Sequence, residues 1–153
     1  MKVVIVDPSK CTGCRLCEVA CSLRATGECN PTRARIHVIG FDEAFCLPVT
    51  CFHCEIPYCA KICPTRAITK GKVGAVKVSR QKCIGCRVCV LACPFGNIAF
   101  SSAEKIVAKC ELCDGEPECV LFCPTGALEF REVDTDMIHK KITFLEKLKE
   151  IYK

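Results

Sequence analysis

The apolar residues of this chain fall in short runs separated by turn residues, and this pattern predicts small strands. Residues 3–6 form an unbroken apolar run before a polar turn, so they predict a strand. In residues 33–39, basic and apolar side chains partly alternate, which predicts a half-exposed strand with its arginines outward. Residues 67–70 and 75–78 flank a turn that contains glycine and predict a hairpin. Together with the helices described below, these elements indicate an α+β chain.

Residues 136–153 form a long segment without cysteine that has the pattern of an amphipathic helix. Asp136 is a suitable N-cap, and lysines fill one face and the C-terminal end, where they suit the helix dipole. Such a helix either packs on the rest of the chain or docks into a groove of a partner, and both interpretations remain open. The apolar residues at helical spacing are Ile138, Ile142, Leu145 and Leu148.

Composition changes this picture, because 18 of the 153 residues are cysteine. This density in a short chain indicates either a disulfide scaffold or a metal framework. Sixteen of the cysteines come in four tight groups, and the chain begins in a strand-like run rather than a secretory leader. We therefore expect metal binding in a reducing compartment rather than disulfides. The groups span residues 11–21, 51–63, 83–93 and 110–123.

The third group has the spacing CxxCxxCxxxC and is followed by Pro94. Three thiolates on a tight loop can surround one corner of an iron–sulfur cube, while the fourth ligates a second cluster in two-cluster bacterial ferredoxins. Gly85 suits a loop whose amides turn toward the sulfurs, and Pro94 ends the helical turn. Zinc sites use two cysteine pairs per metal, so the extra cysteine favours an iron–sulfur cluster over zinc.

The first group repeats the third, including the preceding lysine, the glycine, the arginine and the last alanine. It has Ser22 in place of the proline, so a helix that begins near Cys17 is predicted to continue toward Gly27. The second and fourth groups place four and five residues between their second and third cysteines, and a longer loop can still close on the same cube. Each group thus holds the four thiolates that one cubane needs.

From the first group to the fourth, two, four, two and five residues separate the second and third cysteines. This order of spacings resembles that of the four-cluster ferredoxin-type subunits of multi-subunit oxidoreductases. Such subunits accompany molybdenum or tungsten enzymes, carbon monoxide dehydrogenases and hydrogenases. The resemblance covers residues from about 3 to 130 and implies an α+β fold of two nested two-cluster ferredoxin-like units, with short hairpins and short helices around cubane clusters. One domain over residues 1–130 would combine an outer unit (1–45 and 101–130) with an inner unit (46–100), and the C-terminal helix would occupy 131–153.

The resemblance also implies that ligands cross between groups, so that four [4Fe–4S] clusters use all sixteen motif cysteines. The first cluster would bind Cys11, Cys14, Cys17 and Cys123. The second would bind Cys51, Cys54, Cys59 and Cys93. The third would bind Cys83, Cys86, Cys89 and Cys63. The fourth would bind Cys110, Cys113, Cys119 and Cys21.

A subunit of this kind relays electrons between a catalytic oxidoreductase partner and another redox partner, and it has no active site of its own. Among the partners, the small size and residues 30–36 favour a tungsten or molybdenum aldehyde-type oxidoreductase over a carbon monoxide dehydrogenase or hydrogenase. The alternative is a free soluble polyferredoxin that shuttles electrons between enzymes. An iron–sulfur enzyme or sensor would need an open iron site or an effector pocket, and the sequence has neither signature.

The formal charge of +5 does not indicate a nucleic-acid partner. Each oxidised cluster with its thiolates carries about −2, so four clusters move the total to about −3. Basic runs interleaved with aromatic residues, which nucleic-acid-binding proteins often carry, are also missing from the sequence. No apolar stretch approaches the length that spans a bilayer, so we expect no direct membrane insertion and a cytoplasmic location.

Five further side chains lie in or near the groups. Cys29 and Cys46 fall outside every group and are expected to be buried as small hydrophobic residues. His53 lies between two motif cysteines, where we expect a simple loop residue, with donation to a cluster sulfur as the alternative. Arg15 and Arg87 occupy equivalent places in the repeat and either face solvent, or offset cluster charge or face a partner protein.

Overall fold

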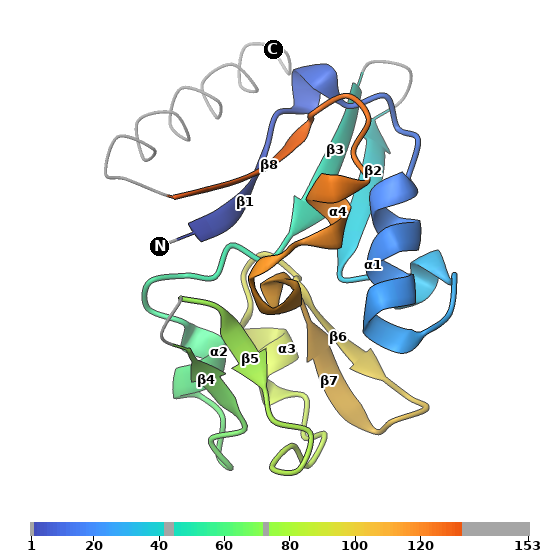
Figure 1. Cartoon of the computed structure of the whole chain (residues 1–153). Coiled ribbons are helices and arrows are strands. Elements are labelled where there is room, and N and C mark those ends of the chain that lie inside the picture. Colours follow the sequence, from blue (N-terminus) through green and yellow to red (C-terminus); the bar gives the residue numbers. More distant parts are fainter. Residues whose placement is uncertain (1, 42–44, 72–73, 133–153) are drawn as a thin grey trace.

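The computed structural model describes residues 2–41, 45–71 and 74–132. The predicted helix of residues 136–153 lies outside this range. The first and last strands of the described part, β1 (Lys2–Val6) and β8 (Leu128–Glu132), form an antiparallel pair in which Val4 lies opposite Phe130 (Figure 1). The predicted strand at residues 3–6 is therefore confirmed. It ends at the 3-10 turn η1 (Pro8–Lys10), where the Asp7 side chain accepts a hydrogen bond from the Ser9 N–H.

The predicted helix after the first cysteine group is α1 (Leu16–Thr26). It begins after Arg15, whose φ of 58° lies in the left-handed region, and it ends at Gly27, also left-handed, whose N–H donates to the Leu23 carbonyl. This end agrees with the stop predicted from the sequence. The helix buries one face, which consists of Cys17, Glu18, Ala20, Cys21 and Ser22.

A hairpin follows the short turn η2 (Pro31–Arg33), with strands β2 (Ile36–Phe41) and β3 (Phe45–Thr50). Alternate residues of β2 are buried and exposed, with Ile36 and Val38 inward, so the half-exposed strand is confirmed. The arginines, however, do not stand on its outer face. Arg33 ends η2 and pairs with Glu28 at 2.9 Å, and Arg35 precedes the strand and is half-buried.

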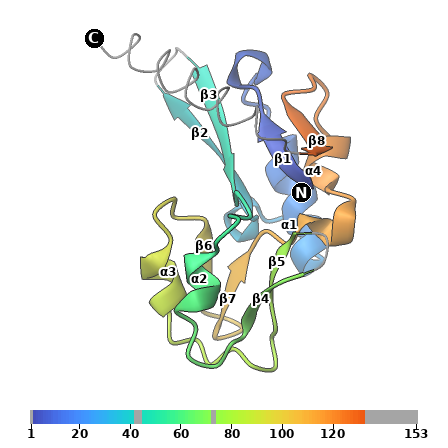
Figure 2. The ribbon, with the colours of Figure 1, turned by 90° about the vertical axis from the view of Figure 1, so that its left-hand side faces the viewer.

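Two smaller hairpins and two short helices make up the other end of the molecule. Strands β4 (Ile68–Lys70) and β5 (Val76–Val78) form the predicted hairpin, with Ile68 opposite Val78. Strands β6 (Ile98–Ser101) and β7 (Ile106–Lys109) form the other. Helices α2 (Tyr58–Lys61) and α3 (Val88–Ala92) lie side by side here, as Figures 1 and 2 both show.

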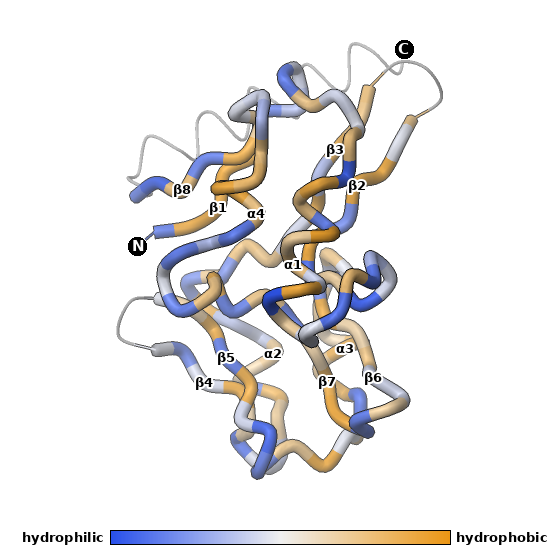
Figure 3. Tube along the Cα trace, turned by 45° about the vertical axis from the view of Figure 1, so that its right-hand side comes forward, coloured by the Kyte–Doolittle hydropathy of each residue, from blue (hydrophilic) through white to orange (hydrophobic). Residues whose placement is uncertain are grey.

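The buried side chains separate into two clusters, which we call the outer core and the inner core. The outer core lies among β1, β2, β8, α1 and the short helix α4 (Glu118–Leu121), and the inner core among β4 to β7 and α3. Figure 3 shows the hydrophobic stretches of these strands. The outer core contains Val4, Cys17, Cys21, Ala34, Ile36, Val38, Ala75, Leu112, Cys119 and Leu128. The inner core contains Ile68, Val76, Cys89, Ile98 and Val107.

These small, mixed elements confirm the α+β class. Because β1 pairs with β8, segments from both ends of the described chain share the outer core. The boundaries predicted between residues 45 and 46 and between residues 100 and 101 fall inside strands β3 and β6, so hairpins run across both of them.

Candidate metal centres

The four cysteine groups share one local geometry. In each group the third cysteine is the second residue of a short or long helix, so its sulfur leaves the first turn. The residue just before the second cysteine has a positive φ in every group, although only two of these residues are glycine. A left-handed residue reverses the loop there, at a cost when the residue has a side chain. These four residues are Gly13, His53, Gly85 and Leu112.

All 18 cysteines are free thiols, and they are not distributed as disulfide partners. The first group lines a small pocket that is partly open to solvent, and its wall includes a cysteine from the fourth group. The cysteines of that wall are Cys11, Cys14, Cys17 and Cys123. Apolar residues of β2, β3 and β8, including Val38, Pro48 and Leu128, close the other sides. Thiols of two distant groups therefore face one space.

Electrostatic interactions between the thiols show which groups lie together in the inner part. The pKa of Cys89 is raised to about 11, first by burial and then by neighbouring thiols, one of which is Cys63 of the second group. Burial also raises the pKa of Cys59, and two thiols add smaller contributions, one from the second group and one from the third. The thiols that raise these two pKa values are Cys63, Cys86 and Cys83 for Cys89, and Cys51 and Cys93 for Cys59.

The same pattern joins the first and fourth groups. Burial raises the pKa of Cys119 well above its ordinary value, and Cys21 of the first group adds to this effect. Burial also raises the pKa of Cys21, and Cys113 of the fourth group adds to this effect. Burial raises the pKa of Cys17 to about 12. Buried thiols of this kind stay protonated unless a cation reaches them, and a coordinated metal removes the proton outright.

The last cysteines of the second and fourth groups have lowered rather than raised pKa values. Burial acts to raise the pKa of Cys63, but hydrogen bonds from the Thr65 hydroxyl and from backbone N–H groups outweigh it and lower the pKa. Cys123 has the same arrangement with Thr125. The Ala67 N–H lies 3.2 Å from the Cys63 sulfur. These threonines were not predicted, although the Cys-Pro-Thr tail that the second and fourth groups share is a sequence signal for them.

His53 is the clearest sign that the space between the cysteines needs a further group. Its side chain is fully buried, although we expected a simple loop residue, and its Nδ1 accepts a hydrogen bond of 3.0 Å from the Val76 N–H. Burial, with the positive charges of Lys109 and Lys70, lowers the pKa of His53 to about 3, so the ring is neutral and carries its proton on Nε2. Nε2 has no partner among the described residues. A sulfur acceptor beside the loop of the second group would satisfy it.

The remaining side chains singled out in the sequence have structural contacts. Cys29 is exposed, so its predicted burial is wrong, while Cys46 is half-buried against the outer core. The guanidinium of Arg87 lies 3.8 Å from the centre of the Phe100 ring. Arg15 is exposed, with its Nη1 4.0 Å from a carboxylate oxygen of Glu18.

Residues 2–41, 45–71 and 74–132 contain neither a site for a single metal ion nor a membrane-crossing helix. No three His, Cys, Asp or Glu side chains there are placed to hold a single metal ion. No helix in this part of the chain is both long enough and apolar enough to cross a membrane.

Comparison with sequence families identifies the class of protein. Residues 43–133 match the family described as "4Fe-4S dicluster domain", and residues 2–23 match a "4Fe-4S binding domain". The chain belongs to the 4Fe-4S dicluster domain family. The predicted [4Fe–4S] cofactor is therefore confirmed, and the sixteen motif cysteines are enough for four such clusters.

Particular relatives confirm the resemblance to ferredoxin-type electron-transfer subunits. The chain is 46% identical over 92 residues to the polyferredoxin-like subunit of aliphatic sulfonate oxidoreductase from Pyrococcus furiosus. The aligned region covers 60% of this chain and 53% of that protein. It is 43% identical over 102 residues to the electron transport protein HydN of Escherichia coli, with 62% and 57% covered. This chain thus spans about half the length of these curated relatives.

A solved structure with a similar fold is the active-site complex BamBC of benzoyl coenzyme A reductase with benzoyl-CoA. The similarity has a TM-score of 0.50 and 29% identity, and it covers 95% of this chain and 89% of that chain.

Proposed function

We propose that this chain is an electron-transfer subunit that relays electrons through four [4Fe–4S] clusters between a catalytic oxidoreductase partner and another redox protein. The observation that carries the proposal is that sixteen cysteines come in four groups along the sequence, and that thiols from separate groups lie close to one another, as Cys123 does beside the first group. A cluster with four thiolate ligands has no open iron position for substrate, so its chemistry is the gain and loss of one electron.

In this proposal the crossing ligand sets follow the neighbours described above. Cys123 completes the set of the first group and Cys21 that of the fourth. Cys93 completes the set of the second group and Cys63 that of the third. The crossing ties residues 1–45 and 101–130 into an outer unit around a nested inner unit, and the pairing of β1 with β8 supports this arrangement. The two cores follow these bounds only in part, because Val107 packs in the inner core and Ala75 in the outer core.

The protein's own groups would hold and tune the clusters. Backbone N–H groups donate to the sulfurs of Cys21 and Cys63, each at 3.2 Å, and stabilise negative charge there. His53 would add a donor at the cluster of the second group. Since cluster ligands must be thiolates, we place the protein in a reducing compartment, the cytoplasm.

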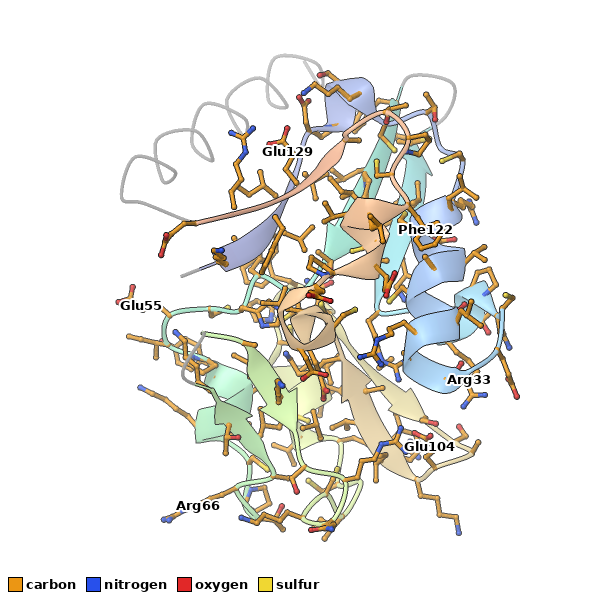
Figure 4. The ribbon with its side chains drawn as sticks, in the orientation of Figure 1. Arg33, Glu55, Arg66, Glu104, Phe122 and Glu129 are labelled. Carbon is orange, nitrogen blue, oxygen red and sulfur yellow. The ribbon has the colours of Figure 1, made fainter. Side chains whose placement is uncertain are left out.

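A bound partner, rather than free diffusion, is supported by apolar side chains that are exposed next to motif cysteines. Tyr58 is 66% exposed beside Cys59, Leu91 is 87% exposed two residues before Cys93, and Phe122 is 54% exposed beside Cys123. Figure 4 labels the side chain of Phe122 at the end of α4. Exposed apolar groups of this size mark interaction sites when they gather. They would bring a partner's redox centre close to the clusters.

For the partner we propose a tungsten or molybdenum oxidoreductase of the aldehyde type. Support comes from the relatives, which are named as subunits of an aliphatic sulfonate oxidoreductase and of a formate hydrogenlyase, and from the fold shared with a benzoyl coenzyme A reductase complex. The name of HydN, an electron transport protein, favours the second candidate, a polyferredoxin that moves between enzymes. Native purification separates the two, because only a subunit arrives with a stoichiometric large partner.

The cluster proposal is tested by loading the chain with iron and sulfide under anaerobic conditions and comparing three variants. Wild type should bind about sixteen irons and about sixteen sulfides per chain. The Cys123→Ala variant should lose the same spectroscopic signal as Cys14→Ala and keep the signal that Cys113→Ala loses. Cys29→Ala, which alters an exposed cysteine outside the groups, should keep all signals. Two clusters per chain, stoichiometric zinc, or a Cys123→Ala spectrum matching that of Cys113→Ala would overturn the proposal.

A further inference from the structure

Lys109, the last residue of β7, is a buried positive charge without a carboxylate partner in the described part of the chain. Its side chain is only 3% exposed. Its ammonium donates to the Val76 carbonyl oxygen at 2.5 Å and to the Cys110 carbonyl oxygen at 2.9 Å. None of the ion pairs among the described residues includes it. Burying an ammonium is costly unless an anion compensates it, so Lys109 indicates a nearby negative charge that carboxylates do not supply.

The groups around Lys109 come from two different cysteine groups. It directly precedes Cys110, the first cysteine of the fourth group. Its ammonium also binds the backbone of Val76, which donates to His53, a residue that lies between Cys51 and Cys54 of the second group. Lys109 therefore lies where the second and fourth groups meet.

One residue of β5 holds this lysine and His53 together. Val76 donates its N–H to His53 Nδ1, and its carbonyl accepts from Lys109 Nζ. Val76 is 1% exposed and belongs to the inner core. The ammonium is thus fixed by buried backbone and cannot turn toward solvent.

The position before the first cysteine does not itself require a buried charge. Lysine stands there in three of the four groups, as Lys10, Lys82 and Lys109. Lys10 and Lys82 are exposed, and Lys10 lies within 4.0 Å of carboxylate oxygens of Asp7 and Glu129. Only the third of these lysines is enclosed, and it is the one at the junction of two groups.

We propose that Lys109 is the shared counter-charge of two [4Fe–4S] clusters, those of the second and fourth groups, and that it raises the reduction potential of both. The proposal rests on the proposed function, since it takes the clusters to occupy those groups. Reduction adds one negative charge to a cluster, so a fixed cation nearby stabilises the reduced form more than the oxidised form. The side-chain contacts of Lys109 among the described residues go to Val76 and Cys110 and not to the first or third group, so we expect the clusters of those two groups to be affected less.

The test is a redox titration, followed by electron paramagnetic resonance, of fully loaded Lys109→Met beside wild type. Two of the four midpoint potentials should become more negative while the other two stay in place. Lys82→Met is the matched control, because it removes an exposed lysine at the same position of the third group, and it should leave all four potentials unchanged. Lys109→Arg keeps the positive charge, so its four midpoint potentials should lie close to those of wild type.

The outcomes separate this proposal from the one on which it rests. Iron contents near eight per chain in wild type would defeat the four-cluster function itself. Unchanged potentials in fully loaded Lys109→Met, or an equal shift in Lys82→Met, would overturn the role of Lys109 alone. If Lys109→Met and Lys109→Gln both lose iron while Lys109→Arg keeps it at wild-type potentials, the charge is required and the proposal stands. Loss of iron in Lys109→Arg as well would assign Lys109 to packing and overturn it.

Discussion

The first and third cysteine groups begin alike and then diverge. Both enter a helix through a left-handed arginine, Arg15 in one and Arg87 in the other, and both carry a left-handed glycine before the second cysteine. After this shared loop, α1 runs for 11 residues and α3 for only 5. The cysteine pattern therefore determines the loop and the first turn, and the residue after the fourth cysteine determines how much protein packs around them.

The physical cause lies at positions 22 and 94. Pro94 disfavours helical backbone at the residue before it, and Cys93 is extended, with φ −85° and ψ 108°. Ser22 imposes no such limit. It is completely buried, its hydroxyl donates to the Val19 carbonyl at 2.9 Å, and the same oxygen accepts from the Asn30 N–H at 3.1 Å. The longer helix then packs against α4, η2 and β2, while α3 contacts α2 and β6.

Ser22→Pro should have the largest effect, because it imposes the ending of the third group on the first. Proline inside a helix removes one N–H donor and clashes with the carbonyl four residues earlier, at a cost of about 3 kcal/mol or more. The thermal midpoint of the loaded protein should fall steeply, with loss of iron from the outer unit. Ser22→Ala removes the hydroxyl but keeps the helix, and it should retain iron. Equal losses in both variants would show that the hydroxyl, not helix length, matters.

Alanine at the two equivalent glycines should reveal different neighbours. A Cβ at Gly85 would overlap the backbone carbonyl of Lys105, whereas a Cβ at Gly13 would lie 2.8 Å from the movable sulfur of Cys46. Both glycines also have a positive φ, which costs other residues about 1–2 kcal/mol.

Gly85→Ala should therefore destabilise by about 2–4 kcal/mol, and Gly13→Ala by about 1–2 kcal/mol. Thermal or chemical denaturation of the two variants gives the comparison. Adding Cys46→Ala should recover part of the loss in Gly13→Ala only. A larger loss for Gly13→Ala than for Gly85→Ala would contradict the contacts described here.

Glu18→Val should have an intermediate effect, since it copies Val90 from the third group into the first. Glu18 is 3% exposed, and its Oε1 accepts a hydrogen bond of 2.6 Å from the Val38 N–H. Valine leaves this buried donor unpaired, which costs about 1–3 kcal/mol. Glu18→Gln keeps an acceptor and should lose less in the same denaturation measurement. If the two variants are equally stable, the hydrogen bond to β2 contributes nothing measurable.

The smallest effect is expected at the repeated arginines. Arg87 stacks over Phe100 at the surface, a contact worth about 0.5–1 kcal/mol, so Arg87→Ala should lose about that amount of stability. A double-mutant cycle with Phe100→Leu measures the coupling directly. Arg15→Ala, without an aromatic partner among its described contacts, should show no coupling to the Phe100 substitution.

Much of this comparison could be predicted from the sequence. The apolar run of β1, the missing proline after the first group, and Gly27 as a stop gave the first strand and the extent of α1. The β4–β5 hairpin followed from two apolar runs around glycines. These are local signals, because a few adjacent residues determine the backbone.

Other features depend on neighbours that are distant in sequence. β3 contains Cys46 and Pro48, which hide its alternation, and Pro48 fits because the strand has a single partner, β2. His53 looked like a loop residue because the N–H group that donates to its Nδ1 belongs to Val76, 23 positions away. Lys109 looked like one of three repeated lysines, and only packing distinguishes it.

The antiparallel pair of β1 and β8 also dictates an order of assembly during synthesis. A ribosome delivers β1 first and β8 last among the described strands, so the sheet that closes the outer core waits until nearly all of these residues have emerged. Both inner hairpins pair over short stretches and can form earlier, since closing a short loop costs less entropy. The region translated first is thus completed last, and a nascent chain that stalls before residue 128 would present its first cysteine group without the strand that covers it.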